Sequence, residues 1–260
     1  IQGILNVPPV TPLFKEEILS RLQQSLSTET SLLILQNVKE FVDCFGAGIS
    51  PLIPLVIDQL VKQWDQLDIT AITSTVCHMT SNVLDLFSPY ILQFTELFLA
   101  KLPFVRVKHA VSIFHTFTTF SEYLDRVDYL VIPAILKWLE RTVGLHISKL
   151  ISYDSHGQGK NVPPLPFINN DEIVNQIKDT LIDFRTIIQS CQYEKYASEI
   201  LNTMFILLQN KLCNQIEIEI NRIISDLTSR LDRQILPYLP QVFSYTSLNM
   251  DEDFKVKLEV

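Results

Sequence analysis

The chain has 260 residues, of which 47% are hydrophobic, 19% are charged and only 6 are glycine. Its formal net charge is −8 at pH 7, the wrong sign for a surface that binds nucleic-acid phosphates or anionic lipids. So few glycines argue against an all-β fold with many tight turns and against the phosphate loops of a dinucleotide-binding domain. The composition therefore predicts a well-buried helical protein that binds no nucleic acid.

Apolar runs such as LLIL at 32–35 and YLVIPAIL at 129–136 are much shorter than the ~18–20 residues that cross a bilayer, so we expect no membrane span. The chain contains four cysteines, Cys44, Cys77, Cys191 and Cys213. Their spacings are irregular and they lie inside apolar helical patterns, which predicts buried free thiols and a cytoplasmic or nuclear protein.

Apolar residues recur at helical spacing along most of the chain, and the segments fall into pairs. A leading helix is expected over 11–27; the pairs are 31–45 with 45–64, 69–87 with 87–102, 105–124 with 120–140, 172–190 with 193–210, and 213–231 with 234–249. The alternation IEIEI at 216–220 lies inside a helical period, so we expect helix there too. The sequence thus predicts an all-α fold of about five helix pairs.

The second helices of these pairs begin with a recurring proline pattern. In FGAGISPLIPLVIDQLVKQW (45–64), Ser-Pro at 50–51 matches Ser-Pro at 88–89, and Ile-Pro at 53–54 matches Ile-Pro at 132–133. Serine is a good N-cap, and proline is tolerated at the first helical position, so Ser50 and Ser88 are expected to cap these helices. Glycines 46 and 48 suit the end of the preceding helix.

The match between pairs returns about every ~40 residues, a period typical of HEAT and armadillo repeats. We therefore expect residues 1–260 to form a single right-handed α-α superhelix. PFVRVKHAVSIF at 103–114 resembles the HEAT turn, with Ala110 at the small position of the helix. The aspartate of that consensus is absent, and Phe104 stands nearby.

Residues 146–171, HISKLISYDSHGQGKNVPPLPFINND, break the period and are expected to form a loop or insertion. Within them, SHGQGKN at 155–161 is similar to a phosphate-binding loop. Asp154 and Asn161 replace the glycine and the hydroxyl residue that the motif requires, and no strand precedes it. A flexible loop is the better interpretation.

No other residues form a catalytic or metal-binding pattern. His78 follows Cys77 directly, and His109 and His115 do not share a helix face, whereas a metal site needs ligands three or four residues apart. The carboxylates are expected to lie on solvated faces. We therefore predict no catalytic, cofactor-binding or metal-binding residue, and no cofactor.

The order of segments resembles the solenoid of the TOR family of giant protein kinases. The resemblance is carried by FSEYLDRVDYLVIPAILKW (120–138), PPLP (163–166), EKYASEILNTMFILLQN (194–210) and ILPYLPQVF (235–243), in that order. The segments SLLILQNVKEFVDCFGAGISPLIPLVIDQLVKQW and STVCHMTSNVLDLFSPYILQFTELFLAKL are similar to the two preceding repeats.

The resemblance implies a segment of a growth-controlling serine/threonine kinase, with the catalytic domain outside these residues. In that family the solenoid binds regulatory subunits, including a raptor-like partner, and shapes a dimer. The segment itself is then no enzyme. The alternative is a nuclear transport receptor of the importin-β or exportin type, which is also acidic and built of HEAT repeats, and which binds cargo and Ran.

Overall fold

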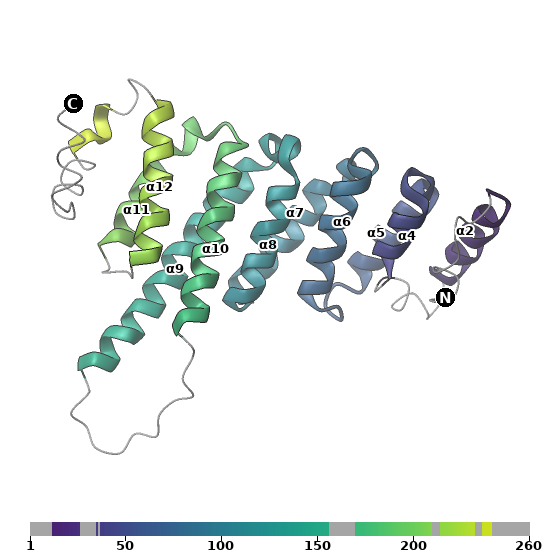
Figure 1. Ribbon diagram of the computed structural model, residues 1–260, viewed down its shortest axis with the longest axis horizontal. Helices are drawn as coiled ribbons and strands as arrows, with labels where there is room; N and C mark the ends of the chain where they lie inside the picture. Colours follow the sequence, from purple (N-terminus) through teal and green to yellow (C-terminus); the bar gives the residue numbers. More distant parts are fainter. Residues whose placement is uncertain are drawn as a thin grey trace, which may run out of the picture. The chain divides into compact units, whose positions relative to one another are not determined.

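The computed structural model describes residues 12–26, 35, 37–155, 170–209, 214–231 and 236–240. All regular secondary structure in these ranges is helical, which confirms the predicted all-α class (Figure 1). The chain divides into two compact units. Unit 1 contains Ile1–Ala134 and Thr186–Cys191, and unit 2 contains Ile135–Arg185 and Gln192–Val260.

Unit 1 is a series of helices, several of which are joined by short 3-10 turns. The α-helices are α2 (Pro12–Leu26), α4 (Val38–Phe45), α5 (Ile53–Lys62), α6 (Ile69–Phe87), α7 (Ile91–Lys101) and α8 (Val107–Thr119). The 3-10 turns are η1 (Gly46–Leu52), η2 (Ser88–Tyr90), η3 (Leu102–Phe104) and η4 (Ser121–Arg126). Helix α4 packs against α6, and α6 packs against α8, so that the three lie side by side (Figure 1).

The core of unit 1 is rich in phenylalanine. Fully buried rings come from successive elements: Phe87, Phe94, Phe98, Phe114, Phe117 and Phe120. Ala110 is also completely buried, which agrees with its expected small position on the inner face of α8. Burying an aromatic ring removes a large apolar area from water, so these side chains supply much of the driving force for packing.

Two of the expected second helices begin later than predicted. Pro51 lies inside η1, α5 begins at Ile53, and Pro54 occupies its first turn. Likewise η2 holds Ser88, whose hydroxyl donates to the carbonyl of Asp85, three residues back. The expected N-cap roles of Ser50 and Ser88 are therefore wrong, because each Ser-Pro pair belongs to a 3-10 turn that precedes the α-helix.

Two other helix ends follow simple backbone chemistry. Gly46 ends α4 with a φ of 51°, a conformation that residues with a side chain rarely adopt. Asp68 caps α6, since its carboxylate accepts from the backbone N–H groups of Thr70 and Ala71 at 3.1 and 3.3 Å. Inside α6, Val83 has non-helical dihedral angles and marks a kink.

Unit 2 contains α11 and α12, with most of α9 and of α10. The bounds are α9 (Asp128–Ser155), α10 (Asn170–Gln189), η5 (Tyr193–Tyr196), α11 (Ala197–Leu208) and α12 (Asn214–Leu231). Helix α11 packs against η5 and α12. The IEIEI segment is helical within α12, as expected, because its isoleucines at 216 and 220 face the core one turn apart.

The expected loop at 146–171 is shorter at its beginning, since α9 continues to Ser155. Apolar residues recur at helical spacing in LHISKLI at 145–151, which favours helix up to this residue in spite of the polar residues that follow. Residues 156–169 lie outside the described ranges. So do residues 31–34 and 36 of the helix expected over 31–45, and most residues of the helix expected over 234–249.

Candidate functional site

Helices α6 and α8 meet through neutral polar side chains. The Cys77 thiol donates to the Thr116 hydroxyl at 3.3 Å, and the Thr80 and Thr119 hydroxyl oxygens lie 2.9 Å apart. Both contacts join residues 39 positions apart in the sequence. The hydroxyls of Thr80, Thr116 and Thr119 also donate to backbone carbonyls of their own helices, so each of these oxygens has a hydrogen-bond partner.

Two further contacts in unit 1 have nearly the same spacing. His78 Nε2 of α6 lies 2.8 Å from Asp43 Oδ1 of α4, 35 residues earlier. Lys101 Nζ, at the end of α7, donates to Asp65 Oδ1 at 2.6 Å, 36 residues earlier, just after α5. First helices therefore contact first helices, and second helices contact the end of the preceding second helix.

Aromatic rings link the same elements within the core. Trp64 lies 5.2 Å from Phe98, and Phe98 lies 6.2 Å from Phe117, measured between ring centroids. Both pairs meet edge to face, the arrangement that ring quadrupoles favour. Trp64 thus packs between successive helices and has no free face for stacking on a ligand.

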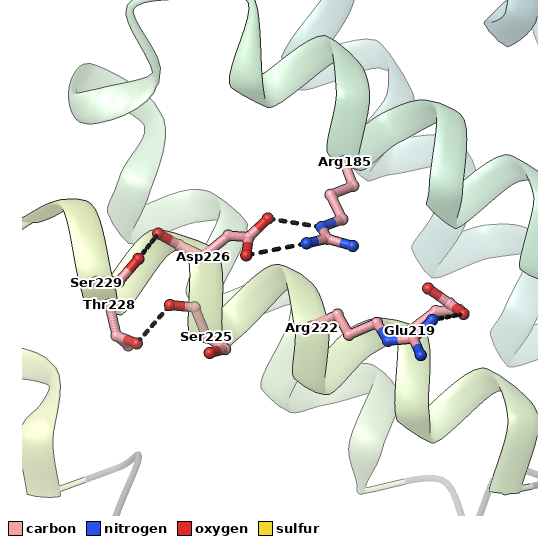
Figure 2. Close-up of polar contacts among 7 residues, drawn as sticks. All are labelled: Arg185, Glu219, Arg222, Ser225, Asp226, Thr228 and Ser229. Atoms are coloured by element: carbon pink, nitrogen blue, oxygen red, sulfur yellow. Dashed lines mark hydrogen bonds and ion pairs between the residues drawn. The ribbon is translucent and has the colours of Figure 1, made fainter.

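Unit 2 uses charged side chains for the corresponding contact. Arg185 of α10 donates through Nε and Nη2 to the two carboxylate oxygens of Asp226 in α12, at 2.6 and 3.1 Å (Figure 2). These residues are 41 positions apart. The hydrogen bond to Asp226 raises the pKa of Arg185 above its usual value, so the guanidinium stays charged.

A second carboxylate of α12 is almost fully buried. Glu219 accepts from Arg222 Nη1 at 2.7 Å, one turn further along the same helix (Figure 2). Its charge also acts on Arg185. The cluster is close to neutral, since two guanidinium groups face the two carboxylates Glu219 and Asp226. Its geometry fits a structural contact between helices, with each charge held by an opposite one.

Tyr193 is a buried phenol in the turn before α11. Burial raises the pKa of Tyr193, and the negative charge of Glu194 adds to the effect. Arg230 of α12 acts in the opposite direction; its Cζ atom lies 5.7 Å from the ring centroid. The phenol therefore remains protonated, and the cation–π contact joins η5 to α12.

The cysteines and histidines of the sequence are placed apart from one another. Cys191 is buried, Cys77 is half-buried and Cys44 is exposed, all with free thiols, while Cys213 lies outside the described residues. The prediction of buried thiols is thus confirmed for Cys191 and wrong for Cys44. The helical period turns Val42 and Phe45 inward and leaves Cys44 on the outer face of α4.

In the part of the chain that the structure describes, no three His, Cys, Asp or Glu side chains come together to form a metal site. The SHGQGKN segment lies almost entirely outside that part. Two stretches, Val38–Lys62 and Ile69–Phe104, are apolar and long enough to cross a membrane by length and composition. Core helices of water-soluble proteins have the same composition, so this finding alone does not assign a membrane position.

No family model and no curated protein matches the chain.

Most of the exposed large apolar side chains are only partly exposed, but one of them is almost fully exposed. The exposed ones are Leu92, Phe104, Tyr129, Ile182, Ile206, Ile218 and Leu236. Single surface hydrophobics at 40–61% exposure are ordinary, but Phe104 is 86% exposed at the turn between α7 and α8. The sequence alone did not show that Phe104 is exposed in this turn, although the absence of an aspartate and the presence of a phenylalanine there were visible.

Proposed function

We propose that the chain is a non-catalytic helical-repeat scaffold that holds protein partners on a right-handed α-α superhelix of the HEAT or armadillo kind. The supporting observation is the spacing of side-chain contacts, which join residues 35, 36, 39 and 41 positions apart. A stack of like helix pairs buries a continuous core between neighbours and leaves long faces for binding other proteins.

Small-angle X-ray scattering of the purified chain tests the superhelix. A compact globule of 260 residues has a radius of gyration of about 18 Å, and a repeat stack of that length is more extended. We expect a value well above the globular one. A value equal to it, with a globular pair-distance distribution, would contradict the superhelix.

On the resemblance of its segment order, we further propose that the scaffold is part of the N-terminal solenoid of a TOR-type serine/threonine kinase in growth signalling. Its partner is then a raptor-like regulatory subunit, and its location is cytoplasmic. The chain's negative charge favours the alternative, a transport receptor of the importin-β or exportin type that takes basic cargo and Ran.

Binding measurements with purified proteins separate these two assignments. The chain is mixed in turn with a raptor-type subunit and with Ran in its GTP-bound and GDP-bound forms, and complexes are detected by analytical ultracentrifugation. We expect a complex with the raptor-type subunit alone. Binding that is selective for Ran-GTP would overturn the kinase assignment and support the transport receptor.

We also propose that no part of the chain spans a membrane. The two apolar stretches are divided by 3-10 turns into helices of 8 to 19 residues, and their side chains form the core of unit 1. A fractionation experiment checks this. The chain should stay in the supernatant after high-speed centrifugation without detergent, whereas a membrane span would carry it into the pellet.

A further inference from the structure

We propose that the turn between α7 and α8 docks an acidic segment of a partner protein, with Phe104 as the apolar anchor and Arg106 and Lys108 as the groups that contact its carboxylates. The inference rests on the proposed scaffold function and names the chemistry of one partner contact.

Phe104 is the most exposed of the large apolar side chains in the described ranges, at 86%. The turn between α5 and α6 occupies the same position one helix pair earlier, and it carries the polar residue Gln66 there. The phenylalanine is therefore no requirement of the turn. Exposing an aromatic ring to water is unfavourable, and covering it by a partner recovers that free energy.

The cations beside Phe104 are available for a partner. No hydrogen bond or ion pair within the described ranges holds the side chain of Arg106 or Lys108, although Lys108 accepts one through its backbone carbonyl. Both residues are exposed. Positive charge on this edge of an acidic chain is complementary to carboxylates rather than to a basic partner.

The acidic groups on the same edge are already used within the fold. Asp65 accepts from Lys101 Nζ, and Asp68 accepts from two backbone N–H groups as the cap of α6. Among these charged side chains of the described ranges, Arg106 and Lys108 are therefore the ones that make no hydrogen bond or ion pair.

Arg106 also stands where a different residue would serve the helix better. It is the N-cap residue of α8 and makes no side-chain cap hydrogen bond, whereas Asp68, at the same position of α6, makes two. Aspartate is among the best N-cap residues and arginine is not. The choice of Arg106 costs local stability, which is consistent with a role in binding.

Aromatic residues and arginine are the side chains that most often dominate the energetics of protein interfaces. An anionic membrane is a weaker candidate occupant. Stable membrane association needs a second anchor or a polybasic cluster, and this edge offers one aromatic ring with Asp65 and Asp68 close by. The observations therefore favour an acidic segment of a partner protein that carries an apolar residue to contact Phe104.

The experiment is a selection from a random peptide display library on the whole purified chain. Selected peptides are then synthesised with a fluorescent label, and their affinity is measured by anisotropy at low and high salt. We expect enriched peptides to combine an apolar residue with several Asp or Glu, and their binding to weaken as salt rises.

Variants of the docking turn locate the site. Phe104→Ser and the double variant Arg106→Glu, Lys108→Glu should each weaken binding of the selected peptides by about tenfold or more. Leu92→Ser and Lys137→Glu are matched controls, because they change one exposed apolar and one exposed basic residue elsewhere. These controls should bind like the native chain, and all variants should keep its circular dichroism and melting temperature.

Several outcomes would overturn the docking proposal. The first is a set of selected peptides without acidic enrichment, and the second is peptide binding that survives Phe104→Ser. The third is Phe104-dependent binding to phosphatidylserine vesicles without peptide binding. The fourth is Phe104-dependent self-association in ultracentrifugation. Each leaves the scaffold function standing, since that is tested by scattering and by the complex with a regulatory subunit.

Discussion

In unit 1, helices α6 and α8 are joined by neutral hydroxyl and thiol groups, whereas in unit 2, α10 and α12 are joined by a two-point ion pair. The thiol and hydroxyl contact of Cys77 with Thr116 spans 39 residues, and the contact of Arg185 with Asp226 spans 41. The spacing is nearly equal although the chemistry differs. The two contacts are therefore alike in their spacing along the chain rather than in residue types.

The difference has a physical consequence. Short Thr and Cys side chains require the two helix backbones to approach closely, and their contacts do not depend on ionic strength. Arginine and aspartate reach further, and their attraction is screened by salt because both side chains are about one-third exposed, at 35% and 28%. The two units should therefore respond differently to salt.

The chain allows each unit to be followed separately. It contains two tryptophans, Trp64 in unit 1 and Trp138 in unit 2, and both are buried. In a Trp138→Phe background the fluorescence reports unfolding of unit 1, and in a Trp64→Phe background it reports unit 2. Urea unfolding in these two backgrounds measures the free energy of unfolding of each unit separately.

The largest effect is expected from Ala110→Asp in unit 1. Ala110 is fully buried in α8, so the variant places a carboxylate where no partner can reach it, and should cost about 4 kcal/mol or more. The neighbouring Val111→Asp is the control, since Val111 is only half-buried and should lose much less. Equal unfolding midpoints for the two variants would show that the inner face of α8 is wrongly assigned.

Thr80→Val should destabilise unit 1 by about 1.5 kcal/mol, with no dependence on salt. Valine keeps the shape of Thr80 but removes the hydroxyl that lies 2.9 Å from Thr119 and also bonds the carbonyl of Val76. Ser81→Val, on the exposed side of the same turn, serves as the control. A loss that shrinks at high salt would contradict the neutral character of this contact.

Asp226→Asn should destabilise unit 2 by about 1 kcal/mol at low salt, and by less at high salt. The amide has the shape of the carboxylate but no charge, so it can accept only one strong hydrogen bond from Arg185. Asp179→Asn changes an exposed carboxylate of α10 and should have little effect. A salt-independent loss at Asp226 would remove the contrast between the two units.

Arg106→Asp should stabilise unit 1 slightly, by about 0.5–1 kcal/mol, because aspartate can cap α8 as Asp68 caps α6. The same variant should abolish binding of acidic peptides to the docking turn. Gln66→Asp adds one negative charge on this edge at a position that caps no helix, and should give no stabilisation. Lower stability of Arg106→Asp would mean that the arginine supports α8 in a way other than capping.

Much of the fold follows from periodicity in the sequence. The helical spacing of apolar residues predicted α6, α8, α10, α11 and α12 closely, because these helices bury one face over many turns. The buried position of Ala110 was also predictable, since it stands on the apolar side of its helix. Helix ends were less predictable: the Ser-Pro pairs form 3-10 turns, a choice that depends on packing against the preceding helix.

The surface turn was beyond sequence reasoning for a related reason. Compared with the HEAT turn that it was expected to resemble, the segment at 103–114 lacks an aspartate and has Phe104 nearby. Nothing in the pattern distinguished a buried Phe104 from an exposed one, because an isolated residue in a short turn has no periodic partner to show which way it points. Cys44 was misassigned for the same reason, since one apolar residue at the edge of a helical stripe can face either side.

By itself the sequence determined that this protein is helical and which helix faces are buried, because burial of apolar stripes is encoded in the spacing of residues along the chain. Only the tertiary structure decided which polar groups meet between helices, neutral in unit 1 and charged in unit 2, and that Phe104 stands beside unpaired positive charge. The polar contacts between helices join residues 35 to 41 positions apart, so they exist only after the helices have packed.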